Sequence, residues 1–176
     1  MSVYGVSFDL GSKQPIVLLK AADGETFLPI WIGHSEAAAI LMKLQGSDPP
    51  RPLTHDLACS LVGALGGEIV RVTVTELRDN TFHAVITLAQ GDAEVDVDSR
   101  SSDAIAIALR AGATIFAADD VIEESGVAFE DGEPEFDRVH GAEGSDEVDW
   151  SAFRQFLDTV SPDEFATGGP DEPTES

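Results

Sequence analysis

A strand-like run passes directly into a helix-like run between Ala93 and Arg110, and this junction restricts the folds open to the chain more than any other segment. The run Ala93–Val97 is typical of a short strand. Apolar or small side chains then occupy positions i, i+3, i+4 and i+7 of residues 105–112, which predicts a helix with one face toward a core. The chain must therefore pack strands and helices in one core.

The same junction carries an unusual number of polar side chains, namely Asp98, Arg100 and Asp103 with several serines between them. Ser101 or Ser102 is expected to cap the helix, because a serine hydroxyl can accept an N–H group of the first turn. The simple interpretation is an internal ion pair between Arg100 and a carboxylate that fixes the junction. The alternative interpretation is a functional site.

The remaining elements alternate between strands and helices. Strands are expected at 3–10, 15–20, 26–32, 68–77, 81–88, 93–97 and 114–117, and helices from Ser35, from Thr54, after residue 100 and at 119–124. Leu57, Leu61 and Leu65 are expected to form the core face of the helix that begins at Thr54. We predict an α+β fold, a compact mixed domain of antiparallel strands with three to four helices over residues 1–124.

Residues 125–176 differ in composition from the domain that precedes them. Residues 1–122 hold 16 acids and 8 bases, a net charge of −8, whereas residues 123–176 hold 17 acids and 2 bases, a net charge of −15. This composition predicts an acidic and largely disordered tail. Trp150, Phe153 and Leu157 recur at helical spacing, so one amphipathic helix is expected near 147–160.

The chain offers little sign of a membrane or of secretion. No apolar run approaches the roughly 18 residues that a spanning helix needs, and the first residues do not resemble a signal peptide. The single cysteine, Cys59, lies in an apolar helical stretch and argues against a disulfide framework. We expect a cytoplasmic protein.

Three predicted helices begin with similar polar chemistry, at His34-Ser35-Glu36, at Thr54-His55-Asp56 and at residues 100–103. Capping explains part of each group, since serine, threonine and first-turn carboxylates favour helix starts. It does not explain His55, because an imidazole gains nothing from the positive end of a helix. The alternative is that the three helix starts converge on one pocket, because helix N-termini attract phosphate.

Such a pocket would have the groups that phosphodiester hydrolysis requires. Arg100 or Arg51 could bind phosphoryl oxygens, and His55 could transfer protons. Carboxylates, with Asp98 and Asp103 first among them and Asp56 as a further candidate, could hold a divalent cation such as Mg²⁺. No sequence signature of metalloproteases, P-loop proteins, serine hydrolases or zinc fingers is present.

Three segments resemble the bacterial and plant bifunctional nuclease family in order and spacing: LPIWIGHSEAAAI at 28–40, RPLTHDL at 51–57 and VDVDSRSSDAIAIALR at 95–110. The resemblance covers roughly residues 3–124. It implies a compact α+β domain that forms homo-oligomers and degrades both DNA and RNA.

The resemblance does not itself assign catalytic residues. We predict His55, Asp56, Asp98, Arg100 and Asp103 as catalytic residues, with Arg51, Ser102 and Glu36 contacting substrate and Asp98 and Asp103 holding the metal. The net charge of −23 predicts weak, salt-sensitive binding of nucleic acid. The alternative function is a non-catalytic oligomeric regulator or adaptor whose tail helix binds a protein partner.

Overall fold

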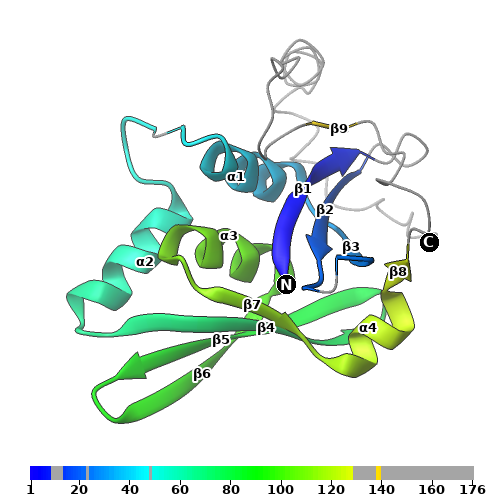
Figure 1. The fold of residues 1–176 in the computed structure, drawn as a ribbon. Helices are drawn as coiled ribbons and strands as arrows, with labels where there is room; N and C mark the ends of the chain where they lie inside the picture. Colours follow the sequence, from blue (N-terminus) through cyan, green and yellow to red (C-terminus); the bar gives the residue numbers. More distant parts are fainter. Residues whose placement is uncertain (9–13, 23, 48, 129–137, 140–176) are drawn as a thin grey trace, which may run out of the picture. The chain divides into compact units, whose positions relative to one another are not determined.

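The computed structural model describes residues 1–8, 14–22, 24–47, 49–128 and 138–139. It confirms the predicted α+β class, with helices and two mostly antiparallel sheets (Figure 1). The helices are α1 (His34–Leu44), α2 (Thr54–Ala64), α3 (Ser101–Ala111) and α4 (Asp119–Ser125). The strands are β1 (Ser2–Phe8), β2 (Pro15–Lys20), β3 (Thr26–Trp31), β4 (Glu68–Arg78), β5 (Thr81–Gln90), β6 (Ala93–Arg100), β7 (Thr114–Ala117), β8 (Val127–Ala128) and β9 (Arg138–Val139).

The first sheet has the strand order β8-β3-β2-β1-β9, and all its pairs are antiparallel. Its central strand β2 is an almost continuous apolar run that is buried from Pro15 to Leu19, as expected for a strand covered on both faces. The short outer strands β8 and β9 lie in the segment that was predicted as an acidic tail, and they pair with β3 and β1.

The second sheet has the order β6-β5-β4-β7, with β7 parallel to β4 and the other pairs antiparallel. Its hairpin between β4 and β5 turns at Asp79 and Asn80, whose φ angles are 51° and 57°. Two consecutive residues with positive φ form the turn type that matches the twist of paired strands. The antiparallel pairing of β5 with β6 places the start of β5 beside the end of β6, where His83 pairs with Arg100.

Helix α3 packs against the second sheet and against helices α1 and α2. It contacts α1, α2, β4 and β5, and Figure 1 shows it beside the strands of the second sheet. Ala104, Ile105 and Ala108 are buried on it, facing a cluster that also contains Ile40 of α1. Gly112 ends the helix with φ of 68°, a left-handed conformation that favours glycine. The buried apolar side chains of α3 therefore fix the position of its polar first turn.

The three predicted capping side chains are not caps. Gly33, Leu53 and Arg100 occupy the N-cap positions, and none makes the side-chain cap hydrogen bond that a serine or threonine would make. Each helix instead begins at or before the predicted cap, so that Ser35, Thr54 and Ser101 lie inside the first turn. In α2 the Asp56 carboxylate accepts the Leu53 N–H at 2.8 Å. In α2 a first-turn carboxylate therefore takes over the role that was assigned to a hydroxyl.

The predicted core face of α2 is also wrong. Leu57, Leu61 and Leu65 are 52%, 56% and 74% exposed, and α2 has no buried residue. The helix instead packs through Cys59 and Val62, which are partly buried against the core. A sequence in which both faces of a helix are apolar does not identify the face that packs, and here the leucines remain at the surface.

The chain divides into two units, residues 1–144 and 145–176. The predicted tail helix near 147–160 lies outside the described residues. None of the helices in the described part of the chain is both long enough and apolar enough to cross a bilayer.

Candidate active site

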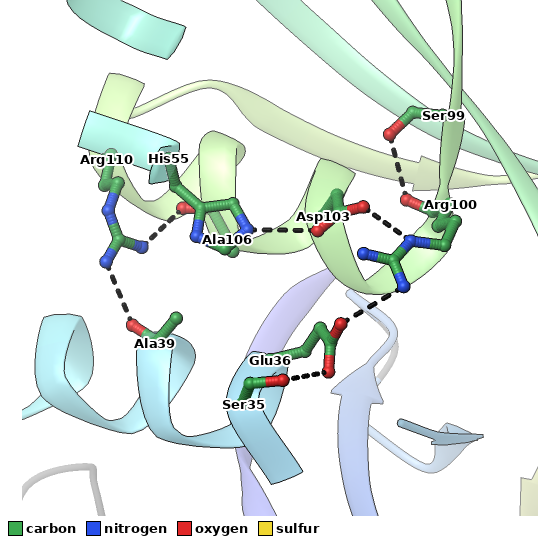
Figure 2. Close-up of polar contacts among 9 residues, drawn as sticks. All are labelled: Ser35, Glu36, Ala39, His55, Ser99, Arg100, Asp103, Ala106 and Arg110. Carbon is green, nitrogen blue, oxygen red and sulfur yellow. Dashed lines mark hydrogen bonds and ion pairs between the residues drawn. The ribbon is translucent and has the colours of Figure 1, made fainter. Parts of the chain in front are cut away.

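Asp103 lies at the centre of a chain of polar contacts that joins all three predicted helix starts (Figure 2). Its Oδ1 atom is 3.1 Å from Nε2 of His55 on α2, and its Oδ2 atom accepts a hydrogen bond of 2.7 Å from Nε of Arg100. A carboxylate can only accept, so the His55 Nε2 carries the hydrogen in this pair. Both oxygens of Asp103 are therefore occupied.

The chain continues from Arg100 to helix α1. Nη1 of Arg100 lies 3.1 Å from Oε1 of Glu36, and the Ser35 hydroxyl donates to the other Glu36 oxygen. Gly33 leaves space for this carboxylate, because a β-carbon at that position would collide with Oε2 of Glu36. The Arg100 side chain is 66% exposed, whereas that of Glu36 is 15% exposed. Arg100 is thus the solvent-facing cation of the cluster.

A second pair lies beside the first and was not foreseen from the sequence. Nε of Arg110 donates to Oδ1 of Asp56 at 2.6 Å, and the Arg110 side chain is only 6% exposed. Its other nitrogens donate to the carbonyls of Ala106 and Ala39, so one guanidinium joins α1, α2 and α3. The signal was present in the sequence, because Arg110 follows Asp103 by two helical turns and lies on the same face of α3.

The environment of each carboxylate favours its charged form. Burial raises the pKa of Asp103, but the hydrogen bonds from Arg100 and His55 outweigh burial, and its pKa falls below the ordinary value. The pKa of Asp56 is also lowered overall: burial raises it, but the hydrogen bonds from the Leu53 N–H and Arg110 lower it by more. The Asp103 carboxylate in turn raises the pKa of Arg100. Both aspartates are anions at neutral pH.

This balance predicts the pH dependence of one substitution. A carboxyl group whose pKa is lowered by folding stabilises the fold above its ordinary pKa of 3.8, and that stabilisation is lost as the pH falls through the lower folded pKa. Asp103→Asn should therefore cost most stability at neutral pH, and its difference from the wild type should shrink below about pH 4. Urea midpoints from pH 7 to 3 measure this, and a constant difference would contradict it.

The Arg100 end of the chain opens into a cleft of about 400 Å³. Glu36 and Arg100 line this cleft, together with Trp31 at the end of β3 and Phe82 at the start of β5; its other lining residues are Gln14, Ile32, Gly33, Asn80, Thr81, Ser101 and Ser102. His55 and Asp103 are not among the lining residues. The groups that can meet a ligand in the cleft are therefore Arg100 and Glu36, with Asp103 and His55 behind them.

The other predicted site residues have different positions. Ser102 lines the cleft but is only 8% exposed. Asp98 is exposed on β6 opposite Val85, and Arg51 is exposed ahead of α2. Neither takes part in the contacts around Asp103. The structure brings together Glu36, His55, Arg100 and Asp103, places Asp56 beside them with Arg110, and leaves Asp98 and Arg51 outside.

The predicted metal pair does not form a ready site. Within the described ranges, no three His, Cys, Asp or Glu side chains are grouped so that they could hold a metal ion. Both oxygens of Asp103 already accept hydrogen bonds, and Asp98 has no contact with Asp103. The residues present do not fit the predicted Mg²⁺ ligand set, and metal assistance stays a prediction.

Comparison with known proteins gives this cluster a context. The model of the bifunctional nuclease domain matches residues 17–130. The chain belongs to the bifunctional nuclease domain family. The matched range contains every residue from Glu36 to Arg110 in the two linked clusters, as well as the three segments that carried the resemblance.

Two Mycobacterium tuberculosis proteins are also similar to this member of the family. Uncharacterized protein MT1877 of strain CDC 1551 / Oshkosh and uncharacterized protein Rv1829 of strain ATCC 25618 / H37Rv are each 42% identical to it over 163 residues. The alignment covers 93% of this chain and 95% of each relative. The similarity therefore extends beyond the matched nuclease domain at both ends.

Proposed function

We propose that this protein is a nuclease that hydrolyses phosphodiester bonds of DNA and RNA at the cleft formed by Trp31, Glu36 and Arg100. The observation that carries the proposal is the contact chain from His55 through Asp103 and Arg100 to Glu36, which ends at this cleft in a bifunctional nuclease domain. These contacts supply a cation, Arg100, and a carboxylate, Glu36. They also supply the imidazole of His55, which positions Arg100 through Asp103.

Arg100 is the group that contacts the scissile phosphate. Its side chain is 66% exposed, and two carboxylates hold it through Nε and Nη1, which leaves Nη2 for a phosphoryl oxygen. A guanidinium fixed in this way needs no reorganisation when charge develops on the phosphate. The start of α3 at Ser101 adds the positive end of a helix to the same cleft.

Glu36 is the carboxylate that faces the cleft, and it accepts a proton from the attacking water. The water oxygen bonds to phosphorus, the bond from phosphorus to the leaving oxygen breaks, and that oxygen takes a proton from solvent. Asp103 and His55 are positioning residues, because they touch Arg100 or each other and not the cleft. They hold Arg100 in one orientation, which lowers the entropic cost of reaching the reactive geometry.

Cleavage assays on highly purified protein test the proposal. Asp103→Asn removes the charge that orients Arg100 and should reduce cleavage of labelled DNA and RNA at least tenfold. Glu94→Gln is the matched control, because it removes a carboxylate that pairs with an arginine, Arg71, outside the cleft. Equal activity of wild type and Asp103→Asn would refute the proposal, and loss of activity in EDTA would support the predicted divalent cation.

The exposed leucines of α2 support a homo-oligomer as part of this proposal. Leu57, Leu61 and Leu65 recur every four residues and are each more than half exposed, which forms one apolar stripe along the helix. A second copy of the chain would cover this stripe. Leu61→Glu should therefore reduce the molecular mass in solution to that of one chain, as measured by light scattering. Ser60→Glu on the same helix is the control, and unchanged mass in Leu61→Glu would contradict the interface.

A further inference from the structure

The cleft beside Arg100 adjoins a second and more apolar cavity. That cavity has a volume of about 590 Å³ and shares Gln14, Trp31, Asn80 and Phe82 with the first. Its remaining lining residues are Pro29, Leu77, Ser125 and Val127. We call these two adjoining cavities the groove; its lining runs from the Arg100–Glu36 pair, past Trp31, to an apolar surface of β3 and the β4–β5 hairpin.

Trp31 has the largest side chain among the described residues that line this groove, and much of that side chain is exposed. It ends strand β3, whose residue Ile30 is 1% exposed, yet Trp31 itself is 51% exposed. A tryptophan left half in solvent forfeits a large part of the free energy that its burial would supply. Its place at the junction of the two cavities gives that exposed ring a flat face for a ligand.

The charge of the groove also differs from that of the chain. Among the described residues that line the two cavities there is one acid, Glu36, and one base, Arg100, whereas the whole chain has 33 acids and 10 bases. A polyanion meets no net negative charge from these side chains. Stacking on an aromatic ring does not depend on positive charge and favours bases that are not already paired in a duplex.

We propose that this groove binds single-stranded nucleic acid, with an unpaired base stacked on Trp31 and the adjoining phosphate on Arg100. The inference rests on the proposed nuclease function and adds the feature that selects the substrate. A base held in a duplex cannot present its face to Trp31 without being unstacked, so single strands bind more tightly than duplexes of the same sequence.

Fluorescence of Trp31 tests the contact in the full chain. The chain has two tryptophans, so Trp150→Phe leaves Trp31 as the single emitter. Titration with oligothymidylate of eight nucleotides should quench this emission to saturation, while inorganic phosphate at the same concentration should not. Absence of quenching, or equal quenching by a duplex of equal length, would overturn the inference.

Affinity measurements provide a second and independent test. Trp31→Ala should weaken binding of the single strand roughly tenfold or more, and Trp31→Phe should retain most of the affinity because it keeps an aromatic face. Phe116→Ala is the matched control, since Phe116 is a similarly exposed aromatic residue, at 47%, outside the groove. Equal affinities for Trp31→Phe and Trp31→Ala, both below wild type, would point to lost structure and would overturn the inference.

The outcomes separate this inference from the proposed function. Cleavage that depends on Asp103 but proceeds equally on duplex and single strand, unaffected by Trp31→Ala, would retain the nuclease and reject the stacking site. Saturable quenching by the single strand in a protein that cleaves nothing would retain the binding groove and reject the nuclease.

Discussion

Replacing Asp56 with alanine is expected to lower the free energy of unfolding by about 3 kcal/mol, as happens when a buried charge loses its partner. Arg110 is only 6% exposed, and its 2.6 Å bond to Asp56 is the ion pair that compensates its buried charge. We take the lower end of the usual range because Asp56 itself is 33% exposed. Chemical denaturation at pH 7 measures the change.

Glu94→Ala is the matched control for this prediction. It also removes the carboxylate of an arginine pair, at 2.8 Å from Arg71, but both side chains of that pair are well exposed. Water and salt replace such a partner at little cost, so the denaturation midpoint should hardly move. Equal and small effects of Asp56→Ala and Glu94→Ala would show that Arg110 does not depend on its partner.

Arg100→Ala is expected to reduce kcat/KM for phosphodiester cleavage about 100-fold or more, the usual cost of removing a preorganised donor to a developing negative charge. The substitution also leaves Glu36 and Asp103 without their shared cation. Arg100→Lys should restore only part of the rate, because an ammonium cannot bind both carboxylates and a phosphate through a planar fork. Initial rates on a labelled oligonucleotide measure both variants.

The control for Arg100 is Arg71→Ala. Arg71 is another arginine of the second sheet that binds a carboxylate, Glu94, and it lies outside the groove. Its loss should change the cleavage rate less than twofold. A comparable loss in both variants would mean that general positive charge, rather than the placement of Arg100, supports the activity.

Much of the fold was readable from the sequence because its elements have strong local signals. The junction at residues 93–110 reads as a strand followed by a helix, and the structure places β6 and α3 there without an intervening loop. The strands expected at 68–77 and 81–88 are likewise present as β4 and β5, with Asp79 and Asn80 in the turn between them. Strand alternation and turn chemistry are local properties, so they survive without knowledge of the rest of the fold.

What failed depended on tertiary packing. The cap positions moved by one or two residues, and in α2 the Asp56 carboxylate bonds the backbone in place of the Thr54 hydroxyl. The leucine stripe of α2 was assigned to the core because apolar spacing gives a face but not its neighbour. Both errors concern how a helix is placed against its neighbours. The sequence of a single segment does not encode that placement.

The candidate site was partly visible for the same reason. The polar excess at three helix starts indicated that His55, Arg100 and Asp103 belong together, but not which atoms meet. Asp98 lies two residues before Arg100 on β6 and was grouped with it, although it takes no part in the cluster. Arg110 was overlooked because a basic residue in the last turn of a helix is ordinary, and only packing reveals that it is buried.

The central claim is that nucleic acid binds where the contact chain opens into the cleft, at Arg100 and Trp31. Nitrogen–proton NMR spectra of arginine and tryptophan side chains test this most directly, during titration with a short phosphorothioate single strand that resists cleavage. We expect the Arg100 Nε–H and the Trp31 indole resonances to shift together to saturation, while those of Arg71 and Arg78 stay unchanged. Shifts of the Arg71 or Arg78 resonances, with those of Arg100 and Trp31 unchanged, would contradict binding at Arg100 and Trp31.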